Sequence, residues 1–569
     1  MARPGLRSYD GDVIEPHDGT ESRPGRTSAG GAAWIGLPVA GALLLAIRLH
    51  AFSLPLEPDE CNYAYIGQRL LAGDRLYIDV WDHQLPGVYA LFAAVMAAFG
   101  DTPLVFRLTA AGFSLVSLCL IFAILLRTAG VAPAALGAAL FAIASSDPGT
   151  AGEGCNREVF MTTLILAAWL SALRAPRSLG WCLASGGALG LASILKPVVV
   201  VHWLLLAAWI VLCTGGAGQT GPGRNLEPHD PLSEPDGRAR SRLLRLAIFA
   251  AAPIAIWLGT FAWFAATGRW SEFADAVFLA NVSYTGTADS FFARFLRFFA
   301  PVRHPFVFAS ALPLWLAGAA AVVWLCAETV RTHSRDKALI LILVLSSFVA
   351  VCLPGRFWPH YYYLMMAPLV LAGASLAVGL ASWVACHLHA PAGRTASTIL
   401  ICAALPAALL ITEYRHYLSQ PPLGITIARY NTRDFWGRAQ GLNVERVTAP
   451  DDTVFVFGND ASIYYYAHRR CASRYTMLTA LADGMRGADH RRRTLLAELR
   501  AAPPRLIILV FDLEPWPEWK VFLGEYYGEP VGWDRHDRTG KPIMAVLARK
   551  DAPIPPVDWN WDRSQLAGP

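Results

Sequence analysis

Long apolar stretches separated by short polar ones fill the chain up to residue 414. After a segment rich in Gly, Pro, Ser, Asp and Arg, residues 1–33, an apolar run extends from Ala32 to Ile47. Ten further runs follow, at 104–126, 131–146, 158–173, 179–195, 198–214, 246–266, 306–329, 338–353, 361–386 and 396–413. Because a helix needs about 20 residues to cross the hydrocarbon core, we expect the shorter runs to tilt or to include flanking residues. The pattern predicts eleven transmembrane helices, residues 34–414, behind a disordered cytoplasmic tail.

One more apolar run, Leu85–Phe99, is placed by the basic residues of the loops. If it does not cross the membrane, Arg127, Arg174 and the Arg-rich loop 215–245 lie on the side of the N-terminus, as the positive-inside rule expects. If it crosses, all of them lie outside. We therefore expect a helix in the outer interface here and a cytoplasmic N-terminus. The predicted outer loops are 55–103, 147–157, 196–197, 267–305, 354–360 and everything after 414.

The pattern changes after residue 425. Thr453–Phe457, Leu506–Phe511 and Ile543–Ala548 have the pattern of buried strands, and Arg491–Arg500 that of part of a helix. Residues 425–569 are enough for one small α/β domain, which the topology places on the outer face of the membrane.

Composition agrees with a polytopic α-helical membrane protein. Hydrophobic residues make up 54% of the chain and charged ones 16%, whereas soluble proteins carry about 25% charged residues. A charge at the bilayer centre costs about 2.5–3.5 kcal/mol on insertion scales, which explains why charge is so sparse in the apolar region. The net charge of +5 is small and no basic stripe occurs, so nothing supports nucleic-acid binding.

The first outer loop begins with acidic residues at the start of a short helix. Asp59 and Glu60 suit the positive end of the helix dipole. At helical spacing Asp59, Tyr63, Ile66 and Leu70 share one face, so a carboxylate lies beside an apolar stripe at the membrane surface. That position suits a base facing a lipid-borne substrate. An isolated Asp-Glu pair more often only caps a surface helix, and this alternative stays open.

The rest of this loop carries a series of short motifs. They are Tyr77-Ile78-Asp79, Asp82-His83-Gln84-Leu85-Pro86, Phe99-Gly100 and Arg107-Leu108. In this order the segment resembles the polyprenol-phosphate-sugar-dependent glycosyltransferases of the GT-C fold, specifically the protein O-mannosyltransferase and lipid A aminoarabinose transferase group (glycosyltransferase family 39-like). That group has Asp-Glu, a short helix ending in Gly, Tyr-x-Asp, Lys-Pro-Pro and an interfacial helix ending in Phe-Gly before Arg-Leu. The strong motifs occupy about 55–110.

The resemblance implies an inverting membrane enzyme that transfers a sugar from a polyprenyl-phosphate carrier to a lipid, glycan or protein outside the cytoplasm. By the family pattern Asp59 is the base for the acceptor hydroxyl, and Glu158 stands at the second acidic position. Gln84 replaces the lysine that helps hold the lipid phosphate, and His83 is the neighbouring candidate to compensate for it. The candidate catalytic residues are Asp59, Glu60 and Glu158.

Candidate substrate-binding residues come from several predicted outer loops. They are Tyr63, Asp82, His83, Gln84, Lys196, Arg294, Arg297, Arg356 and His360. Guanidinium groups suit a donor phosphate, but arginines and aromatic residues also line membrane interfaces without any catalytic role, and Lys196 could simply extend to the headgroups. No cofactor is required by the pattern. A divalent metal, Mg²⁺ or Mn²⁺, is one alternative role for Asp59 and Glu158 together, and Glu158 equally suits a helix N-terminus.

Two functions from other classes compete with a transferase. A transporter or flippase of lipid-linked envelope precursors would place ionisable residues near the bilayer midplane and often shows an internal repeat, whereas the candidate charges lie on one face and no repeat is evident. A binding module on a membrane anchor would not need eleven spans. We therefore expect a glycosyltransferase in the inner membrane of a bacterium, with the C-terminal domain outside the cytoplasm.

Overall fold

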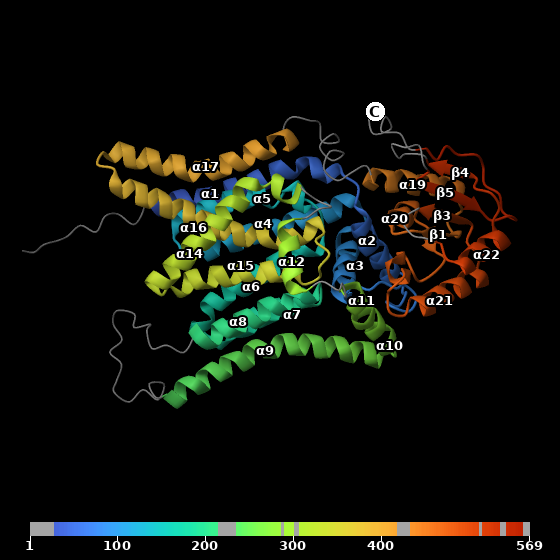
Figure 1. The fold of residues 1–569 in the computed structure, drawn as a ribbon, viewed down its shortest axis with the longest axis horizontal. Coiled ribbons are helices and arrows are strands. Elements are labelled where there is room, and N and C mark those ends of the chain that lie inside the picture. Colours follow the sequence, from blue (N-terminus) through green and yellow to red (C-terminus); the bar gives the residue numbers. More distant parts are fainter. Residues whose placement is uncertain are drawn as a thin grey trace, which may run out of the picture.

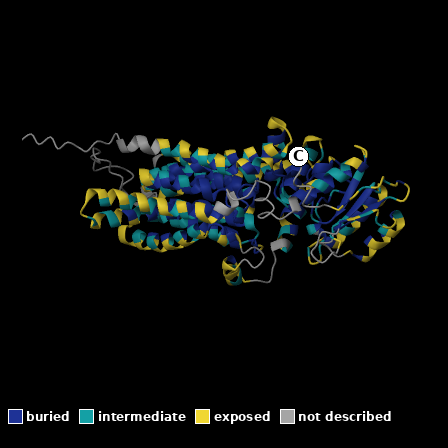
Figure 2. Cartoon of the chain, turned by 90° about the horizontal axis from the view of Figure 1, so that it is seen from above, coloured by how far each residue is buried: buried dark blue, intermediate teal, exposed yellow. Residues whose placement is uncertain are grey.

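The computed structural model describes residues 28–213, 235–285, 290–300, 306–417, 433–510, 515–534 and 542–560. Long helices lie side by side along the longest axis of the molecule, and a small sheet with its own helices lies at one end of them (Figure 1). Exposed residues occupy the outward faces of the bundle, and its interior is buried (Figure 2). The apolar character of that outer surface is what a lipid environment requires.

The helical region begins with α1 and extends to α17. Its α-helices are α1 (Ser28–Arg48), α2 (Pro58–Leu71), α3 (Pro86–Phe99), α4 (Pro103–Thr128), α5 (Val131–Ala144), α6 (Arg157–Arg174), α7 (Leu179–Ser193), α8 (Val200–Cys213), α9 (Pro235–Ala266), α10 (Trp270–Ala274), α11 (Asn281–Thr285), α12 (Phe291–Phe299), α13 (Phe306–Ala309), α14 (Leu312–Thr332), α15 (Arg335–Cys352), α16 (Tyr363–His387) and α17 (Pro391–Tyr417).

Helices cover the apolar runs of the sequence, and the run 306–329 is divided between α13 and α14. Within the described ranges six helices, in α1, α4, α9, α14, α16 and α17, are long and apolar enough to cross a membrane. The total of eleven remains a prediction, since α5, α7 and α8 are shorter. Two helices begin earlier in the chain than the apolar runs do, and the boundaries of the membrane region stay predictions. Helix α1 begins at Ser28, inside the segment expected to be a tail, and α9 begins at Pro235, inside the expected inner loop 215–245. Residues 1–27 and 214–234 lie outside the described residues.

Small residues allow the helices to approach closely. On α7, a Cβ atom added to Gly186 would lie 1.9 Å from the carbonyl oxygen of Phe249, and one added to Gly190 would lie 2.8 Å from the Cα of Pro253. The two glycines are four residues apart and face α9, the small-xxx-small arrangement that drives helix association in membranes. Helix α16 is enclosed by α5, α14, α15 and α17 and forms the centre of the bundle.

The connections between the helices form two groups at opposite ends of the bundle. Far from the sheet, Arg127 at the end of α4 donates to the carbonyl oxygen of Leu173 at 3.0 Å. Near the sheet, Arg48 at the end of α1 donates to the carbonyl oxygen of Gly152 at 3.0 Å. Arg127 and the segment that ends in Arg174 therefore meet at the same end of the bundle, while the side of the membrane that this end faces stays a prediction. Helix α3 lies at the sheet end against α2, and its 14 residues extend about 21 Å.

The C-terminal region forms a five-stranded sheet with helices around it. Its elements are α19 (Arg433–Val447), β1 (Thr453–Phe457), α20 (Ser462–Ala467), β2 (Arg470–Cys471), α21 (Ala488–Ala501), β3 (Leu506–Val510), α22 (Pro517–Tyr526), β4 (Gly532–Asp534) and β5 (Met544–Ala548). The strand order is β2-β1-β3-β5-β4, with β1 parallel to β2 and β3, and β5 antiparallel to β3 and β4. The three strands and the helix expected from the sequence are all present.

This α/β region rests on the first loop and α2. The hydroxyl of Tyr466 accepts from the backbone of Leu56 at 2.8 Å, and Tyr65 on α2 accepts from the backbone of Cys471 at 2.8 Å. Beside them, the backbone of Trp81 donates to the carbonyl oxygen of Arg474 at 2.8 Å. Backbone groups of both partners are thus fixed by the contact, which gives α2 one defined orientation over the bundle.

Candidate active site

The local sequence fixes the start of α2 and therefore the direction of Asp59. Glu57 is the residue before the helix, Pro58 occupies its first turn, and Glu60 completes a capping box by accepting from the backbone of Glu57 at 3.0 Å. Asp59 is half-buried, and Tyr63, one turn further along the same face, is buried. The predicted pair of carboxylate and tyrosine therefore faces the interior of the site.

Glu60 faces a different set of partners. It is fully buried, and its Oε1 accepts from Arg107 Nη1 at 2.9 Å and from the backbone of Cys155 at 2.6 Å. A Cβ atom added to Gly154 would lie 2.7 Å from the same oxygen, so the loop before α6 packs directly on this carboxylate. With both oxygens engaged, Glu60 is suited to hold the loop rather than to transfer a proton.

Glu158 and Lys196 form a buried ion pair close to Asp59. Glu158 is in the first turn of α6, and its Oε1 lies 2.6 Å from Lys196 Nζ. The ammonium group lies 3.2 Å from the centre of the Tyr361 ring, a cation–π contact. Burial lowers the pKa of Lys196, and the charge of Glu158 only partly opposes this effect. Both Asp59 and Glu158 also act electrostatically on His360, so the structure brings these four predicted residues together.

Arg157, which the sequence did not single out, completes this cluster. Its guanidinium lies over the ring of Tyr63, 5.6 Å from the ring centre, and its Nη1 donates to Oε1 of Gln84. Burial raises the pKa of Tyr63 well above its usual value, although Arg157 opposes this. The sequence feature that could have identified Arg157 is its position next to Glu158, where an outer loop meets the start of a helix.

Asp82, His83 and Gln84 form a continuous hydrogen-bonded chain. Asp82 accepts from Asn62 Nδ2 and from Tyr89, both at 2.7 Å, and its Oδ1 lies 2.8 Å from His83 Nδ1. His83 Nε2 lies 3.1 Å from the amide nitrogen of Gln84. Burial raises the pKa of Asp82, but His83 and the hydrogen bonds outweigh it and hold this pKa below its usual value. The three residues therefore act as one unit.

The remaining predicted residues lie apart from this cluster. Arg294 donates to the carbonyl oxygen of Leu353 at 2.5 Å, and Arg297 and Arg356 are exposed. Helix α12, which carries Arg294 and Arg297, exposes Phe292 and packs Phe298 into the bundle. This agrees with an interfacial helix, and the structure provides no contact from these three arginines to Glu158 or Lys196 among the described residues.

The cluster does not suit a divalent metal ion. Within the described ranges, no three His, Cys, Asp or Glu side chains gather as a metal would require. Glu158, one of the two expected ligands, is 2.6 Å from a lysine ammonium, and Arg157 adds a second buried cation. A dication at Asp59 and Glu158 would be repelled by both groups, so we derive no step through a metal.

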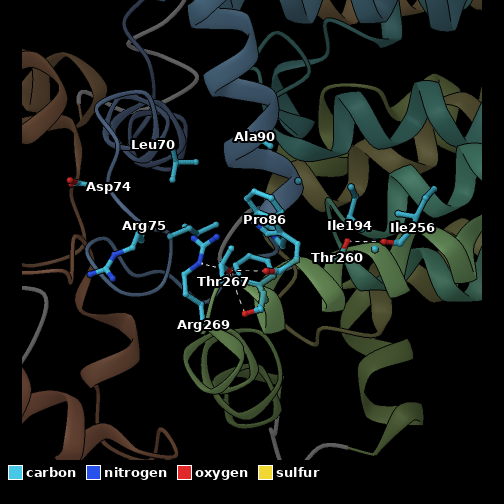
Figure 3. Close-up of a pocket in the computed structure, with 15 residues that line it drawn as sticks. Leu70, Asp74, Arg75, Pro86, Ala90, Ile194, Ile256, Thr260, Thr267 and Arg269 are labelled. Atoms are coloured by element: carbon cyan, nitrogen blue, oxygen red, sulfur yellow. Dashed lines mark hydrogen bonds between the residues drawn. The ribbon is translucent and has the colours of Figure 1, made fainter.

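An apolar groove of about 750 Å³ opens beside the cluster, between the first loop, α3, α7 and α9. Figure 3 shows Arg75, Thr267 and Arg269 at one end of it and Ile194, Ile256 and Thr260 toward the other. Pro86 lies between the two ends, two residues beyond Gln84. The groove thus combines an apolar length with a cationic end.

Arg269 is the second residue that the sequence did not single out. It is buried, donates to the Thr267 hydroxyl at 2.9 Å and lies over the ring of Phe264 at 5.1 Å. Neighbouring Arg75 is paired with Asp79 at 2.8 Å, whereas no carboxylate among the described residues lies within ion-pair distance of Arg269. Burial and the charge of Arg75 lower the pKa of Arg269. An anion in the groove would reverse that effect.

These features define a class of fold: a membrane-embedded helical bundle with an acidic residue on the first loop and an α/β region at the same end. The chain has the GT-C fold. The structure of ArnT from Cupriavidus metallidurans bound to undecaprenyl phosphate matches 92% of this chain and 100% of its own length, at 17% identity and a TM-score of 0.56.

A second solved structure shows the same fold at lower coverage of its own chain. The archaeal oligosaccharyltransferase AglB from Archaeoglobus fulgidus, in complex with an inhibitory peptide and a dolichol-phosphate, matches 94% of this chain and 75% of its own. Its identity is 13% and its TM-score 0.52. At the level of sequence, no protein-family model and no curated protein matches this chain. The likeness therefore establishes the fold.

Proposed function

We propose that this protein is a glycosyltransferase of the bacterial inner membrane. It moves a sugar from a polyprenyl-phosphate carrier to a hydroxyl of a lipid, glycan or protein acceptor on the outer side of the membrane. The observation that carries the proposal is the position of half-buried Asp59 in the first turn of α2, where its charge acts on the buried cations Lys196 and Arg157. The bound lipids of the two structural neighbours, undecaprenyl phosphate and dolichol-phosphate, support the donor class.

In this proposal Asp59 is the base. It accepts the proton of the acceptor hydroxyl while the hydroxyl oxygen forms a bond to the anomeric carbon of the sugar. The bond from that carbon to the carrier phosphate breaks on the opposite side, so the configuration inverts and the electron pair leaves with the phosphate. Lys196 and Arg157 are near enough to Asp59 to stabilise the charge that develops on this phosphate.

The groove supports the same proposal by accommodating the lipid part of the donor. A polyprenyl chain would lie along the apolar wall formed by Ile194, Ile256 and Trp263, and the cations Arg75 and Arg269 would lie at headgroup level. Pro86 and Gly87 line this groove and follow Gln84 by two and three residues, so the Gln84–Arg157 contact is close to the groove along the chain. A carrier bound in this way would present its phosphate between the groove and the acidic cluster.

The orientation in the membrane is part of the proposal. We place the N-terminus in the cytoplasm and the α/β region outside, because Arg127 and the other basic loop residues then lie inside. A flippase gains no specific support. Its ionisable residues would lie near the bilayer midplane, whereas Asp59 and Glu158 lie in the first turns of α2 and α6 and Lys196 lies in the connection between α7 and α8.

The direct test is turnover of a polyprenyl-phosphate-linked sugar by purified protein in lipid nanodiscs. We expect Asp59→Asn to lower the rate about 10²- to 10⁴-fold, the range for loss of a general base. Asp451→Asn, which changes an exposed carboxylate of the α/β region, is the matched control and should retain full activity. Full activity of Asp59→Asn would remove the proposed base, and no turnover by the wild type with any carrier-linked sugar would remove the proposed reaction.

A further inference from the structure

The contact between Gln84 and Arg157 has no counterpart in the sequence resemblance, because there a lysine stands at the position of Gln84. We propose that Arg157 is a carrier-phosphate ligand in this chain and that Gln84 is the residue that positions it. This inference rests on the proposed function. The resemblance expects a cation at residue 84. In this chain we assign that role to Arg157, the first residue of α6.

Arg157 has the environment of a cation that awaits an anion. Only 3% of the residue is exposed, and its Nε has no hydrogen-bond partner among the described residues. The described residues also place no carboxylate within 4.0 Å of its guanidinium; Glu158, next along the chain, is committed to Lys196 at 2.6 Å. A buried charge is costly unless it is paired, so a ligand anion is the group that would complete this site.

The shape of the guanidinium favours phosphate as that anion. Its planar set of donors matches phosphate oxygens with two parallel hydrogen bonds. One edge is held by Gln84 and one face by the ring of Tyr63, so Nε and the remaining amine are the donors left for a ligand. Lys196 supplies a neighbouring positive charge, since the charge of Arg157 acts on its pKa. Two cations, one in the first turn of α6 and one in the connection between α7 and α8, would therefore enclose the phosphate.

The hydrogen-bonded chain explains how Gln84 can hold an arginine. An amide can present either its oxygen or its nitrogen, and only the oxygen accepts from a guanidinium. In the neutral imidazole whose Nδ1–H donates to the Asp82 carboxylate at 2.8 Å, Nε2 is the acceptor for the Gln84 amide nitrogen at 3.1 Å. The Gln84 oxygen then has to point toward Arg157.

This chain extends into the α/β region. Asp82 accepts from Asn62 Nδ2 at 2.7 Å, and Asn62 Oδ1 accepts from the hydroxyl of Thr476 at 2.7 Å. Asn281, on α11, adds a hydrogen bond to the carbonyl oxygen of His83 at 2.6 Å. Gln84 is thus oriented by groups from three separate parts of the chain, which is the arrangement expected for a residue whose orientation matters.

A charge exchange tests the inference. The full chain is placed in nanodiscs, and tryptophan fluorescence measures its binding to undecaprenyl phosphate and to undecaprenol, which lacks the phosphate. We expect Arg157→Gln to weaken the binding of undecaprenyl phosphate about 10- to 100-fold and to leave the binding of undecaprenol unchanged. Adding Gln84→Lys to this variant should raise its affinity for undecaprenyl phosphate at least about fivefold, because the lysine returns a cation to the same place.

Positioning by Gln84 has its own readout. Gln84→Leu keeps the approximate shape and the charge of the site but removes the oxygen that accepts from Arg157, so the ratio of the two affinities should fall. A purely structural role would instead lower the melting temperature and leave this ratio unchanged. Arg438→Gln, an exposed arginine of the α/β region, is the control. If Arg157→Gln does not fold, Arg157→Met, which keeps an apolar stem over Tyr63, replaces it.

The outcomes separate the two proposals. A wild type that binds undecaprenyl phosphate no better than undecaprenol would contradict the proposed function itself. A wild type that discriminates between them, with equal discrimination in both Arg157 variants, would overturn this inference and leave the proposed function standing. Loss of discrimination that Gln84→Lys cannot restore would show that Arg157 supports the site without binding the phosphate, and would also overturn it.

Discussion

Asp59 and Glu60 are adjacent in sequence, but the structure places them in different surroundings, with Asp59 half-buried and Glu60 fully buried. We expect Glu60→Gln to destabilise the protein and Asp59→Asn to inactivate it with little change in stability. Glu60 is fully buried and accepts hydrogen bonds from Arg107 at 2.9 Å, from the backbone of Cys155 at 2.6 Å and from that of Glu57 at 3.0 Å. A glutamine can keep part of this geometry but not the charge that faces the buried guanidinium.

The size of the effect follows from that burial. Removing one partner of a buried ion pair costs about 3–5 kcal/mol. Arg107 also donates to the carbonyl oxygen of Pro55 at 2.5 Å, which places the expected loss near the lower end, about 3 kcal/mol. Replacing both partners removes the uncompensated charge, so Glu60→Gln combined with Arg107→Met should recover at least half of the loss.

The assay is thermal unfolding in detergent, followed in parallel with turnover of the carrier-linked sugar. A loss of about 3 kcal/mol corresponds to a fall in melting temperature of roughly 5–10 °C. The Asp59→Asn variant should have a melting temperature close to that of the wild type, because Asp59 is only half-buried. If Glu60→Gln melted like the wild type but lost turnover, Glu60 would act in the chemistry and the reasoning from its burial would be refuted.

Three further changes test other parts of the structure. Burial lowers the pKa of Lys196 below its usual value of 10.5, so its charge is lost as the pH rises through that lower pKa. The value of kcat/KM for the donor should therefore fall on the alkaline side of the pH profile. Lys196→Arg, which stays charged, should remove this fall. Arg269→Gln should raise KM for the carrier-linked donor about tenfold with kcat unchanged, because the groove loses its buried cation; an unchanged KM would place the carrier elsewhere. Gly186→Ala should reduce the yield of folded protein by separating α7 from α9, whereas Gly187→Ala, whose added Cβ would meet only Ala252 at 3.7 Å, should be tolerated; equal yields by size-exclusion chromatography would contradict this packing.

The helices and the shared face of α2 could be predicted because lipid imposes a simple rule on each segment separately. Apolar runs mark helices whatever their neighbours are. The strand at Thr453–Phe457 was equally visible, since its apolar residues are bounded by polar ones. By the same logic Asp59 and Tyr63 could be placed on one face from their spacing alone.

Partners from distant segments could not be predicted in this way. Nothing local to Glu60 indicates that Arg107 lies 2.9 Å away, and nothing local to Gln84 indicates a contact with Arg157. Both depend on how the first loop packs against helices that follow much later in the chain. Arg269 was missed for a similar reason, although Gly268, with its positive φ of 67°, marks the turn that directs it into the groove.

The bond between Asn62 and Thr476 has a consequence for the order of biosynthesis. A ribosome completes the first loop and most of the membrane helices long before residue 476 emerges, and domains generally fold as units during synthesis. Until then Asn62 lacks the hydroxyl that donates to its side-chain oxygen, and the segment that orients Gln84 is unsupported on that side. A nascent or truncated chain already inserted in the membrane would therefore carry the first loop without this support from the α/β region.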